Sequence, residues 1–254
     1  MVKLDGRVAL VTGAGRGIGR ATALALSKCG AQVMCVSRTK SELQRLSRET
    51  GLEYIVETVA TDKGCARIVD QTRRRLGPVD ILINNAGVGS YRDRPIWDMT
   101  NRVWEESLAT NLNGPFYLTR RVIRDMRSRN WGRIVMVAST AGQFAWPRMS
   151  SYAASKHGVL GLMRAVAQDV APYNVTCNAV LPGWVQTRMA AKHAQADARR
   201  RGVSVARIWE EWAAESPAQR IVTAEEVANA ILFLVTDAAS GINGDAITIA
   251  LGGT

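Results

Sequence analysis

The stretch TGAGRGIGR, residues 12–20, directly follows the apolar run Arg7–Val11 and leads into Ile18–Cys29. The short apolar run predicts a buried strand, and Ile18–Cys29 has the apolar spacing of a helix. Glycines between two such elements permit a tight turn, and they let backbone N–H groups at the helix N-terminus approach a phosphate. The stretch therefore predicts the first strand–turn–helix unit of an α/β fold.

The glycine spacing is Gly13-x-x-x-Gly17-x-Gly19, which departs from the usual G-x-G-x-x-G fingerprint of dinucleotide-binding proteins. Taken alone, such a turn can be an ordinary connection between a strand and a helix that binds no ligand. Its position after the first strand and before the first helix favours a dinucleotide site.

Short β-branched runs alternate with helical segments along almost the whole chain. Further helices are predicted at Lys40–Glu49, Lys63–Leu76, Asn101–Ser128, Ser151–Val170 and Ala224–Thr236, the last with Thr223 as its N-cap. Further strands are predicted at Gln32–Val36, Tyr54–Val59, Asp80–Ile83, Arg133–Ala138, Val175–Leu181 and Ala246–Ala250. This alternation predicts an α/β fold: a single Rossmann-type domain over residues 1–254, with a doubly wound parallel sheet of about seven strands and helices on both faces.

The segment 186–217 is the one long departure from this alternation, and its Ala, Arg and Trp content predicts inserted helices. Ligands of doubly wound sheets bind at the carboxyl ends of the strands, where the strand order reverses. An insertion that follows a strand at that edge would cover the ligand site. We expect it to act as a lid.

Composition excludes several classes of function. The chain has 254 residues, is 47% hydrophobic and has a formal net charge of +11, with the tightest basic cluster at Arg199–Arg201. Because the basic residues are scattered without an aromatic-interleaved motif, we expect a solvated surface and no nucleic-acid partner. No run approaches the roughly 18 apolar residues of a membrane span, and the N-terminus resembles no secretory signal. We expect a cytoplasmic protein with no membrane partner.

The cysteines and histidines predict no metal site. Four cysteines show no C-x-x-C pair, and the chain has two histidines. A His/Cys metal centre is therefore not expected, and reduced thiols are the simplest interpretation of the cysteines.

Tyr152 and Lys156 lie four residues apart on the predicted helix Ser151–Val170, hence on one face. An ammonium one turn away would lower a tyrosine pKa from about 10 toward the working pH, as acid/base catalysis requires. Ser139, from a strand end, could donate a hydrogen bond to the same substrate oxygen. The pair alone is also compatible with an ordinary exposed helix face, so the other motifs decide.

Six motifs occur in one order along the chain: Thr12-Gly-x-x-x-Gly-x-Gly19, Asn84-Asn85-Ala86-Gly87, Asn111, Ser139, Tyr152-x-x-x-Lys156 and Pro182-Gly183-x-x-x-Thr187. Together they resemble the short-chain dehydrogenase/reductase family over essentially the whole chain, in its ketoacyl-reductase-like form. The resemblance implies a Rossmann-type fold, NAD(P) dependence and a homo-oligomer, a tetramer or a dimer.

The resemblance also implies the roles of individual residues. Tyr152 would protonate a carbonyl oxygen during hydride transfer, and Lys156 would hold the nicotinamide ribose and lower the pKa of Tyr152. Ser139 would steady the carbonyl, with Thr140 as the alternative, and Asn111 would maintain a water relay behind Lys156. Strand alternation would point Ser139 and Thr140 to opposite faces, and the thirteen-residue spacing to Tyr152 favours Ser139.

The implied cofactor contacts come from the glycine turn and from the loops after the next strands. Asp62 matches the aspartate that contacts adenine in the family, although a helix N-cap role is also compatible. The full set is Gly13, Arg16, Gly17, Ile18, Gly19, Ser37, Arg38, Asp62, Asn85, Ala86, Gly87, Tyr152, Lys156, Val185 and Thr187.

Charge favours NADP(H) over NAD(H). NAD enzymes of this fold place an acidic residue at the end of the second strand, where it binds the ribose 2′-OH and repels a 2′-phosphate. Here that position reads Ser37-Arg38, and Arg38 with Arg16 could clamp a phosphate. The alternative is that both arginines are solvated loop charges.

The substrate is expected to be a small-molecule ketone or alcohol. Residues bordering the site in the family suggest a pocket for a bulky, mostly apolar compound: Gln143, Phe144, Trp146, Met149 and Trp184. Trp209 and Trp212 would line this pocket or pack a core. A 3-oxoacyl thioester is an alternative substrate. Asn130 and Tyr173 replace arginines typical of carrier-protein reductases, although Arg127, Arg129 and the run Arg199–Arg201 could substitute for them. The same residues are also compatible with alcohol oxidation or with a non-catalytic dinucleotide sensor.

Overall fold

The computed structural model describes residues 3–89 and 94–253. Seven parallel strands form one sheet in the order β3-β2-β1-β4-β5-β6-β7. The predicted doubly wound sheet is therefore confirmed. The strands are β1 (Val8–Thr12), β2 (Gln32–Ser37), β3 (Glu53–Val56), β4 (Ile81–Asn84), β5 (Gly132–Val137), β6 (Val175–Pro182) and β7 (Ala246–Ile249).

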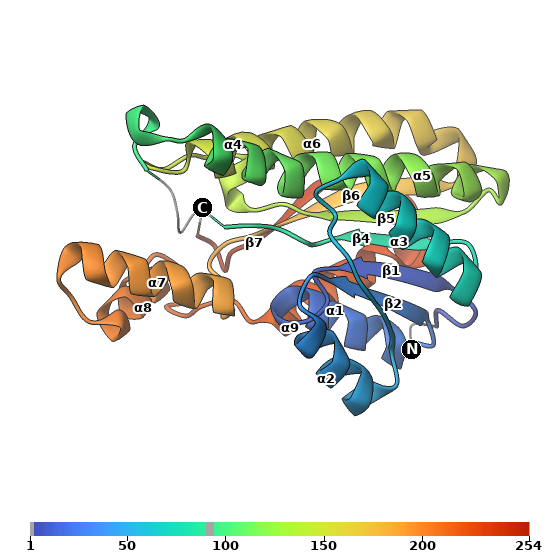
Figure 1. Ribbon diagram of the computed structural model, residues 1–254, viewed down its shortest axis with the longest axis horizontal. Coiled ribbons are helices and arrows are strands. Elements are labelled where there is room, and N and C mark those ends of the chain that lie inside the picture. Colours follow the sequence, from blue (N-terminus) through green and yellow to red (C-terminus); the bar gives the residue numbers. More distant parts are fainter. Residues whose placement is uncertain (1–2, 90–93, 254) are drawn as a thin grey trace.

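Helices cover both faces of the sheet (Figure 1). One face carries α1 (Gly17–Lys28), α2 (Lys40–Thr50) and α9 (Ala224–Leu234), and the other carries α3 (Asp62–Arg75), α4 (Asn101–Leu108), α5 (Gly114–Ser128) and α6 (Ser150–Val170). Short 3₁₀ turns lie between these elements: η1 (Ile96–Asp98), η3 (Thr140–Gly142), η4 (Ala171–Tyr173) and η5 (Asp237–Ala239).

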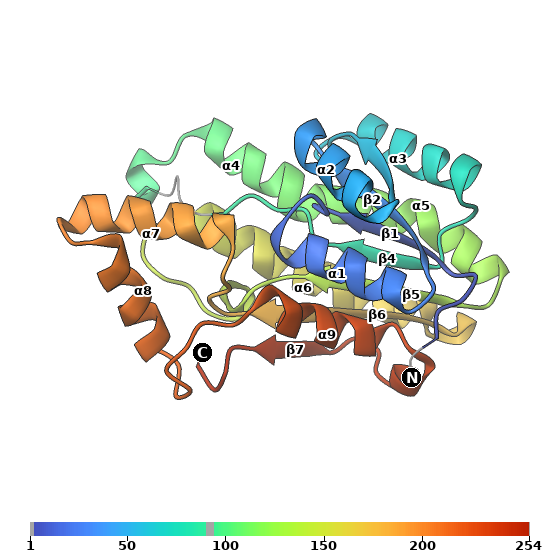
Figure 2. The ribbon, with the colours of Figure 1, turned by 90° about the horizontal axis from the view of Figure 1, so that it is seen from below.

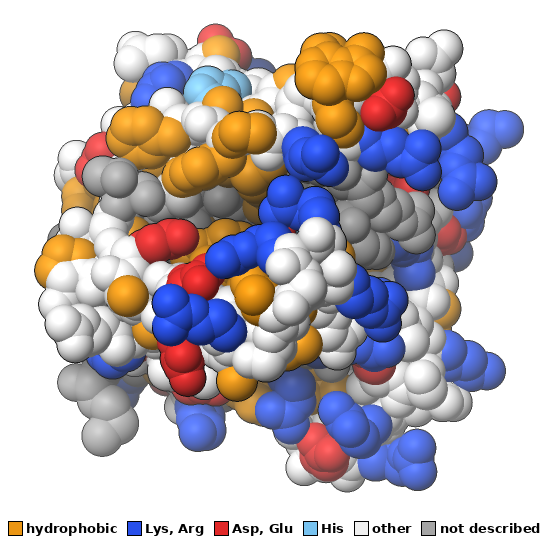
Figure 3. Space-filling view, turned by 90° about the vertical axis from the view of Figure 1, so that its left-hand side faces the viewer, with side chains coloured by type: hydrophobic (Ala, Val, Ile, Leu, Met, Phe, Trp, Pro, Cys, Tyr) orange, Lys and Arg blue, Asp and Glu red, His pale blue; other side chains and the backbone are white. Residues whose placement is uncertain are grey.

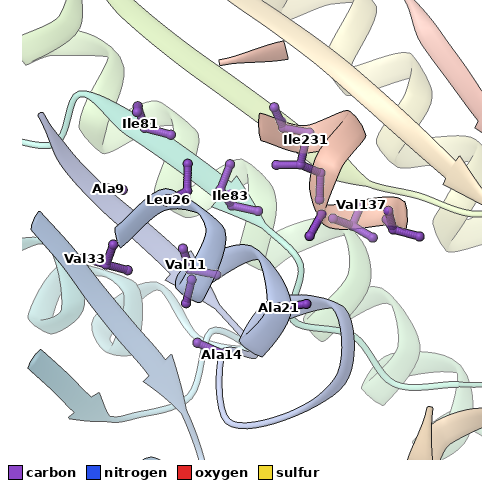
Figure 4. Packing of buried hydrophobic residues seen from close by; sticks show 14 of the residues in the cluster. Ala9, Val11, Ala14, Ala21, Leu26, Val33, Ile81, Ile83, Val137 and Ile231 are labelled. Atoms are coloured by element: carbon purple, nitrogen blue, oxygen red, sulfur yellow. The ribbon is translucent and has the colours of Figure 1, made fainter. Parts of the chain in front are cut away.

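The central strands are buried on both sides, which explains their continuous apolar sequence. Ala9 and Val11 of β1 face the α1 and α9 side with Ile83 of β4, whereas Leu10 and Leu82 face the α3, α5 and α6 side. Figure 4 shows the first of these cores, where Leu26 from α1 and Ile231 from α9 meet the sheet. The period of two along each strand thus divides the interior into two hydrophobic cores.

The strand order reverses between β1 and β4, because β2 and β3 lie on one side of β1 and β4 to β7 on the other. The loops after β1 and β4 therefore diverge at the carboxyl edge of the sheet. This topological switch point is where doubly wound folds bind their ligands.

Two predicted elements differ from the structure. The third strand, predicted at Tyr54–Val59, is Glu53–Val56, so residues 57–59 already cross the carboxyl edge. The predicted helix Asn101–Ser128 is interrupted by a π-helical turn, η2 (Ala109–Asn113), between α4 and α5. Such turns are frequent at functional sites, and hydrophobic periodicity does not reveal them.

The predicted inserted helices are present as α7 (Arg188–Arg201) and α8 (Val205–Ala214), which stand at one end of the molecule (Figure 2). Backbone hydrogen bonds that join Trp184 and Gln186 to Val222 close the base of the insertion. Ala194, Ile208 and Trp212 belong to a hydrophobic cluster separate from the two cores of the sheet. The insertion is a subsidiary unit attached at the carboxyl edge.

Candidate active site

Thr12 and Asn85 join the two loops at the switch point. The buried Thr12 hydroxyl accepts hydrogen bonds from the backbone N–H groups of Asn85 (3.0 Å) and Ala86 (2.9 Å). In return, the Asn85 side-chain amide donates to the Thr12 carbonyl at 2.7 Å. Asn85 thus points back into the glycine turn and fixes it against the loop after β4.

This arrangement explains two of the glycines. Gly13 has φ +67°, a left-handed conformation that glycine adopts without strain, and a Cβ there would lie 2.7 Å from Asn85 Nδ2. A Cβ at Gly19 would collide with the same nitrogen and with the Gly13 carbonyl. The glycine spacing therefore leaves room for the Asn85 side chain, so the glycines do more than connect the strand to the helix.

A cleft of about 220 Å³ opens over this turn. Helix α1 starts at Gly17 without a side-chain N-cap, so its first N–H groups face the cleft unpaired by a capping side chain. Thr110 lines the cleft, and its buried hydroxyl has no hydrogen-bond partner within residues 3–89 and 94–253. Both features suit a phosphate-bearing ligand that reaches from the helix N-terminus toward the π-helical turn. The predicted cofactor residues lining the cleft are Gly13, Arg16, Gly17, Ile18, Gly19, Ser37, Arg38, Asn85, Ala86, Gly87, Tyr152, Lys156 and Thr187.

Glu42 is a cleft residue that the sequence reasoning missed. Its carboxylate lies 2.6 Å from Arg16 Nη1 and 3.3 Å from Arg188 Nη1, and its side chain is 15% exposed. Arg38 is exposed beside it. The end of β2 carries no acid, as predicted, but the first turn of α2 supplies one that two arginines neutralise.

Asp62 is not brought to the cleft. Its carboxylate pairs with Arg120 and Arg121 of α5, which holds the pKa of Asp62 below its ordinary value chiefly through the hydrogen bond from Arg121. Its alternative role as an N-cap is also wrong, because Thr61 caps α3 by accepting from the Gly64 N–H. Since β3 ends at Val56, Thr58 lines the cleft where Asp62 was expected.

Tyr152 and Lys156 are one turn apart on α6, as predicted. The Lys156 ammonium lies 5.6 Å from the Tyr152 ring centre and donates to the Val137 carbonyl at 2.8 Å. Burial lowers the pKa of Lys156 to about 8. The two side chains therefore form one unit at the carboxyl end of β5.

Asn111 lies in the π-helical turn, and its side chain is fully engaged. The amide oxygen accepts from the Val88 N–H at 2.8 Å, and the amide nitrogen donates to the Val88 carbonyl at 3.1 Å and to Ser155 Oγ at 3.0 Å. Asn111 therefore links the loop after β4 to α6, immediately before Lys156.

Ser139 and Thr140 both line a second, larger cavity. Strand alternation does not separate them as predicted, because β5 ends at Val137 and Thr140 opens the turn η3. Ser139 Oγ accepts from the Ala141 N–H at 3.1 Å, whereas Thr140 is buried. The half-buried Ser139 hydroxyl is the more accessible of the two.

The large cavity has a volume of about 520 Å³ and lies between the sheet edge and the insertion. Trp146, Met149 and Trp184 line it as predicted, and so does Val185, which lines this cavity rather than the cleft. Gln143 and Phe144 are exposed and do not line it. Four residues border both spaces: Ile18, Tyr152, Thr187 and Met189.

The two tryptophans of α8 differ in role. Trp212 is buried, lines the large cavity and stacks on Trp184 with ring centres 3.7 Å apart. Trp209 packs edge-on against Trp212 and does not line the cavity. His193 of α7, which the sequence reasoning did not select, also borders the cavity, and burial lowers its pKa to about 4.

Metal-binding groups and membrane-spanning helices are both absent from the described part of the chain. Among the residues that the structure describes, no three His, Cys, Asp or Glu side chains form a group that could hold a metal ion. Within residues 3–89 and 94–253, no helix has both the length and the apolar character to cross a membrane.

The fold and the site define a doubly wound α/β protein in which a glycine-turn cleft and a larger cavity meet at Tyr152, one helical turn from Lys156. The sequence model of the family described as short chain dehydrogenase matches residues 7–198. The chain belongs to this family.

Known relatives match over nearly their full length. The chain is 34% identical over 250 residues to the 3-oxoacyl-[acyl-carrier-protein] reductase of Escherichia coli, covering 98% of this chain and 97% of that protein. It is 38% identical over 256 residues to the putative ketoacyl reductase of a monensin polyketide synthase from Streptomyces virginiae, again covering 98% and 97%. A solved variant of actinorhodin polyketide ketoreductase with NADPH superposes with a TM-score of 0.91 at 34% identity, covering 99% of each chain.

Proposed function

We propose that the protein is an NADPH-dependent oxidoreductase that reduces a ketone to a secondary alcohol. The observation that carries this proposal is the position of Tyr152, which borders both the cleft and the large cavity. A ketone in the large cavity would meet a proton donor and the cofactor at this junction. The relatives support the reaction, since three are named as reductases of 3-oxoacyl or ketoacyl groups or of acetoacetyl-CoA.

The cleft residues would hold the dinucleotide, whose nicotinamide supplies the hydride. The open N-terminus of α1 would bind phosphate, the unpaired Thr110 hydroxyl would donate to the dinucleotide from the wall of the cleft, and Lys156 would donate to ribose hydroxyls. Tyr152 transfers its phenolic proton to the carbonyl oxygen, while the Lys156 ammonium stabilises the resulting phenolate. The Ser139 hydroxyl donates to the same oxygen and fixes its position.

The charges at the adenosine end favour NADPH. Arg38 lines the cleft beside Ser37, and a guanidinium binds a phosphate through two parallel hydrogen bonds. The acid nearby, Glu42, is already neutralised by Arg16 and Arg188. The NADPH in the solved ketoreductase supports the same choice.

A 3-oxoacyl thioester is the more specific substrate class that the named relatives support. The positions of Asn130 and Tyr173 argue against docking a carrier protein in the usual way, and Arg127 of α5 is engaged with Tyr173. The direction of the reaction, reduction or alcohol oxidation, depends on the cofactor ratio.

We infer that the chain forms a homo-oligomer. Large apolar side chains are exposed on η1, α4 and α5: Ile96, Trp97, Trp104 and Phe116. A surface of this kind is typical of a subunit interface. Light scattering on the purified protein tests the inference, and a monomer at micromolar concentration would contradict it. A cytoplasmic location remains a prediction.

The proposal is tested by screening ketones and 3-oxoacyl thioesters with NADPH and NADH, following nicotinamide absorbance. Tyr152→Phe should bind NADPH within about twofold of the parent and lower kcat by at least about 100-fold, the scale of one general acid. Tyr173→Phe, which removes a phenol outside the site, is the matched control and should keep parental kcat. Residual activity of Tyr152→Phe near the parental value would refute the assignment.

A further inference from the structure

Arg148 lines the large cavity, and its guanidinium has no charged partner within residues 3–89 and 94–253. It lies in the loop between η3 and α6, four residues before Tyr152. The other arginines that line this cavity have carboxylate partners, Arg200 with Asp197 and Arg220 with Glu226. Arg148 is exposed and makes no hydrogen bond or ion pair within the described residues. Its guanidinium is therefore available to a ligand.

The backbone of Arg148 is held in a conformation that arginine disfavours. Its φ is +68°, in the left-handed region, where a side chain with a Cβ is strained and glycine is not. Two of the other non-glycine residues with positive φ, Asn130 and Asn174, are asparagines, which tolerate this region through local hydrogen bonds. An arginine at such a position lowers the free energy of unfolding, and backbone strain of this kind is typical of functional sites.

The surroundings of Arg148 favour an anion that belongs to the substrate. It lines the large cavity and not the cleft, so the phosphates of the dinucleotide are held by other residues. Its neighbours Trp146 and Met149 are apolar, so the guanidinium is the charged group on this part of the cavity wall and can bind an anion through charge-assisted hydrogen bonds. Basic and acidic side chains lie side by side across the middle of this face, with hydrophobic side chains above them (Figure 3).

We propose that Arg148 is a specificity-determining residue that binds an anionic group, carboxylate or phosphate, carried by the substrate beyond its ketone. This inference rests on the proposed ketone reduction and names the substrate class more closely. The planar guanidinium offers two parallel N–H groups that match either anion. The ketone then lies toward Tyr152 and the anion toward the mouth of the cavity.

The test compares two matched pairs of ketones with saturating NADPH. The carboxylate pair is 5-oxohexanoate and its methyl ester; the phosphate pair is acetoacetyl-CoA and the neutral acetoacetyl-N-acetylcysteamine thioester. The variants are Arg148→Gly and Arg148→Gln. Arg164→Gln controls for net charge, because Arg164 is an exposed arginine of α6 that lies outside the cavity and has no partner in the described part of the chain.

The ratio of kcat/KM for the anionic over the neutral member should fall about tenfold in both Arg148 variants for at least one pair, the scale of one hydrogen bond to a charged group. The pair that responds identifies the anion as carboxylate or phosphate. Arg164→Gln should keep the parental ratio. A parental ratio for both pairs in Arg148→Gly overturns the inference, while turnover of the neutral ketones leaves the proposed function intact.

Two readouts do not depend on turnover. With saturating NADP⁺ in the cleft, quenching of the cavity tryptophans reports binding of each anionic probe, and Arg148→Gly should weaken the better probe about tenfold relative to Arg164→Gln. If Arg148→Gly binds each anionic probe as tightly as Arg164→Gln does, the inference is overturned, even if neither variant turns over a ketone probe. Arg148→Gly should also melt at the parental temperature or above, because glycine relieves the left-handed strain; a melting temperature well below the parent would instead assign Arg148 a structural role.

Discussion

At the scale of single residues, the environment of Lys156 decides the charge of the site. Burial disfavours its ammonium form, so its pKa falls from 10.5 to about 8. The hydrogen bond to the Val137 carbonyl fixes its position but supplies no counter-charge. Near neutral pH most molecules still carry the ammonium, which is the form that stabilises a tyrosine phenolate.

We expect kcat/KM for NADPH to fall as the pH rises through about 8, because the Lys156 ammonium of the free enzyme is then deprotonated. The neutral amine no longer stabilises the Tyr152 phenolate and binds the cofactor ribose less well. Stability should change in the opposite sense. The unfolded chain keeps this proton up to about pH 10.5, so the cofactor-free protein gains stability between these two pH values. Initial rates and urea titrations from pH 6 to 10 measure both effects. A profile of kcat/KM that stays flat to pH 10 would contradict this role for Lys156.

Arg38 gives a second prediction at this scale. Arg38→Ala should weaken NADPH binding about tenfold and NADH binding less than about twofold, because only NADPH offers the 2′-phosphate. Arg48→Ala, on α2 and outside the cleft lining, is the matched control. Fluorescence titration of both cofactors measures the ratio. Equal weakening of both cofactors would show that Arg38 contributes no selectivity.

At the scale of elements, the π-helical turn η2 is what brings Asn111 to the loop after β4. One turn wound more widely than an α-helix joins α4 to α5 and directs the Asn111 amide toward Val88 and Ser155. The same turn places the unpaired Thr110 hydroxyl at the cleft. An irregular turn within a long helix therefore supplies contacts to both the scaffold and the site.

Asn111→Ala should lower the free energy of unfolding by about 1–3 kcal/mol, because it removes two hydrogen bonds to the part-buried backbone of Val88 and one to the buried Ser155 hydroxyl. Asn113 lies in the same turn, and its side chain makes no hydrogen bond within residues 3–89 and 94–253, so Asn113→Ala should cost under about 0.5 kcal/mol. Urea unfolding of the two variants gives the comparison. Similar losses in both would mean that the turn geometry, and not the Asn111 amide, carries the stability.

At the scale of the whole molecule, two side-chain contacts help to hold the insertion against the sheet edge. The stack of Trp184 on Trp212 joins α8 to the loop after β6, and the pairing of Arg16 and Arg188 with Glu42 joins α7 to the cofactor half. Both contacts border the spaces that the proposed reaction uses. We therefore expect these contacts to position the insertion over the large cavity.

Trp212→Ala should loosen the insertion, because truncating a buried aromatic side chain typically costs about 3–5 kcal/mol of stability. We expect KM for the ketone to rise at least about tenfold, while the Kd for NADPH stays within about twofold. Limited trypsin digestion should cut faster at the basic end of α7, Arg199–Arg201. Trp209→Ala, in the same helix but outside the cavity lining, should have a smaller effect. Unchanged ketone KM and digestion in Trp212→Ala would contradict the role of the stack.

Local sequence patterns determined much of the fold. The strands, the glycine turn and the predicted N-cap Thr223 are all present, and Thr223 forms a capping box with Glu226. The tyrosine–lysine pair was also predictable, since residues four apart on a helix share a face. These features depend on torsion angles and periodicity within a few residues, and such information is contained in a short stretch of chain.

Tertiary structure alone decided which polar side chains reach the site. Glu42 meets Arg16 from 26 residues away and Arg188 from 146 residues away, so no local pattern reveals the triad. The early end of β3 gives the cleft Thr58 and leaves Asp62 to the arginines of α5. Side-chain pairing depends on where whole elements pack, and packing is settled by the two hydrophobic cores rather than by the sequence next to each charge.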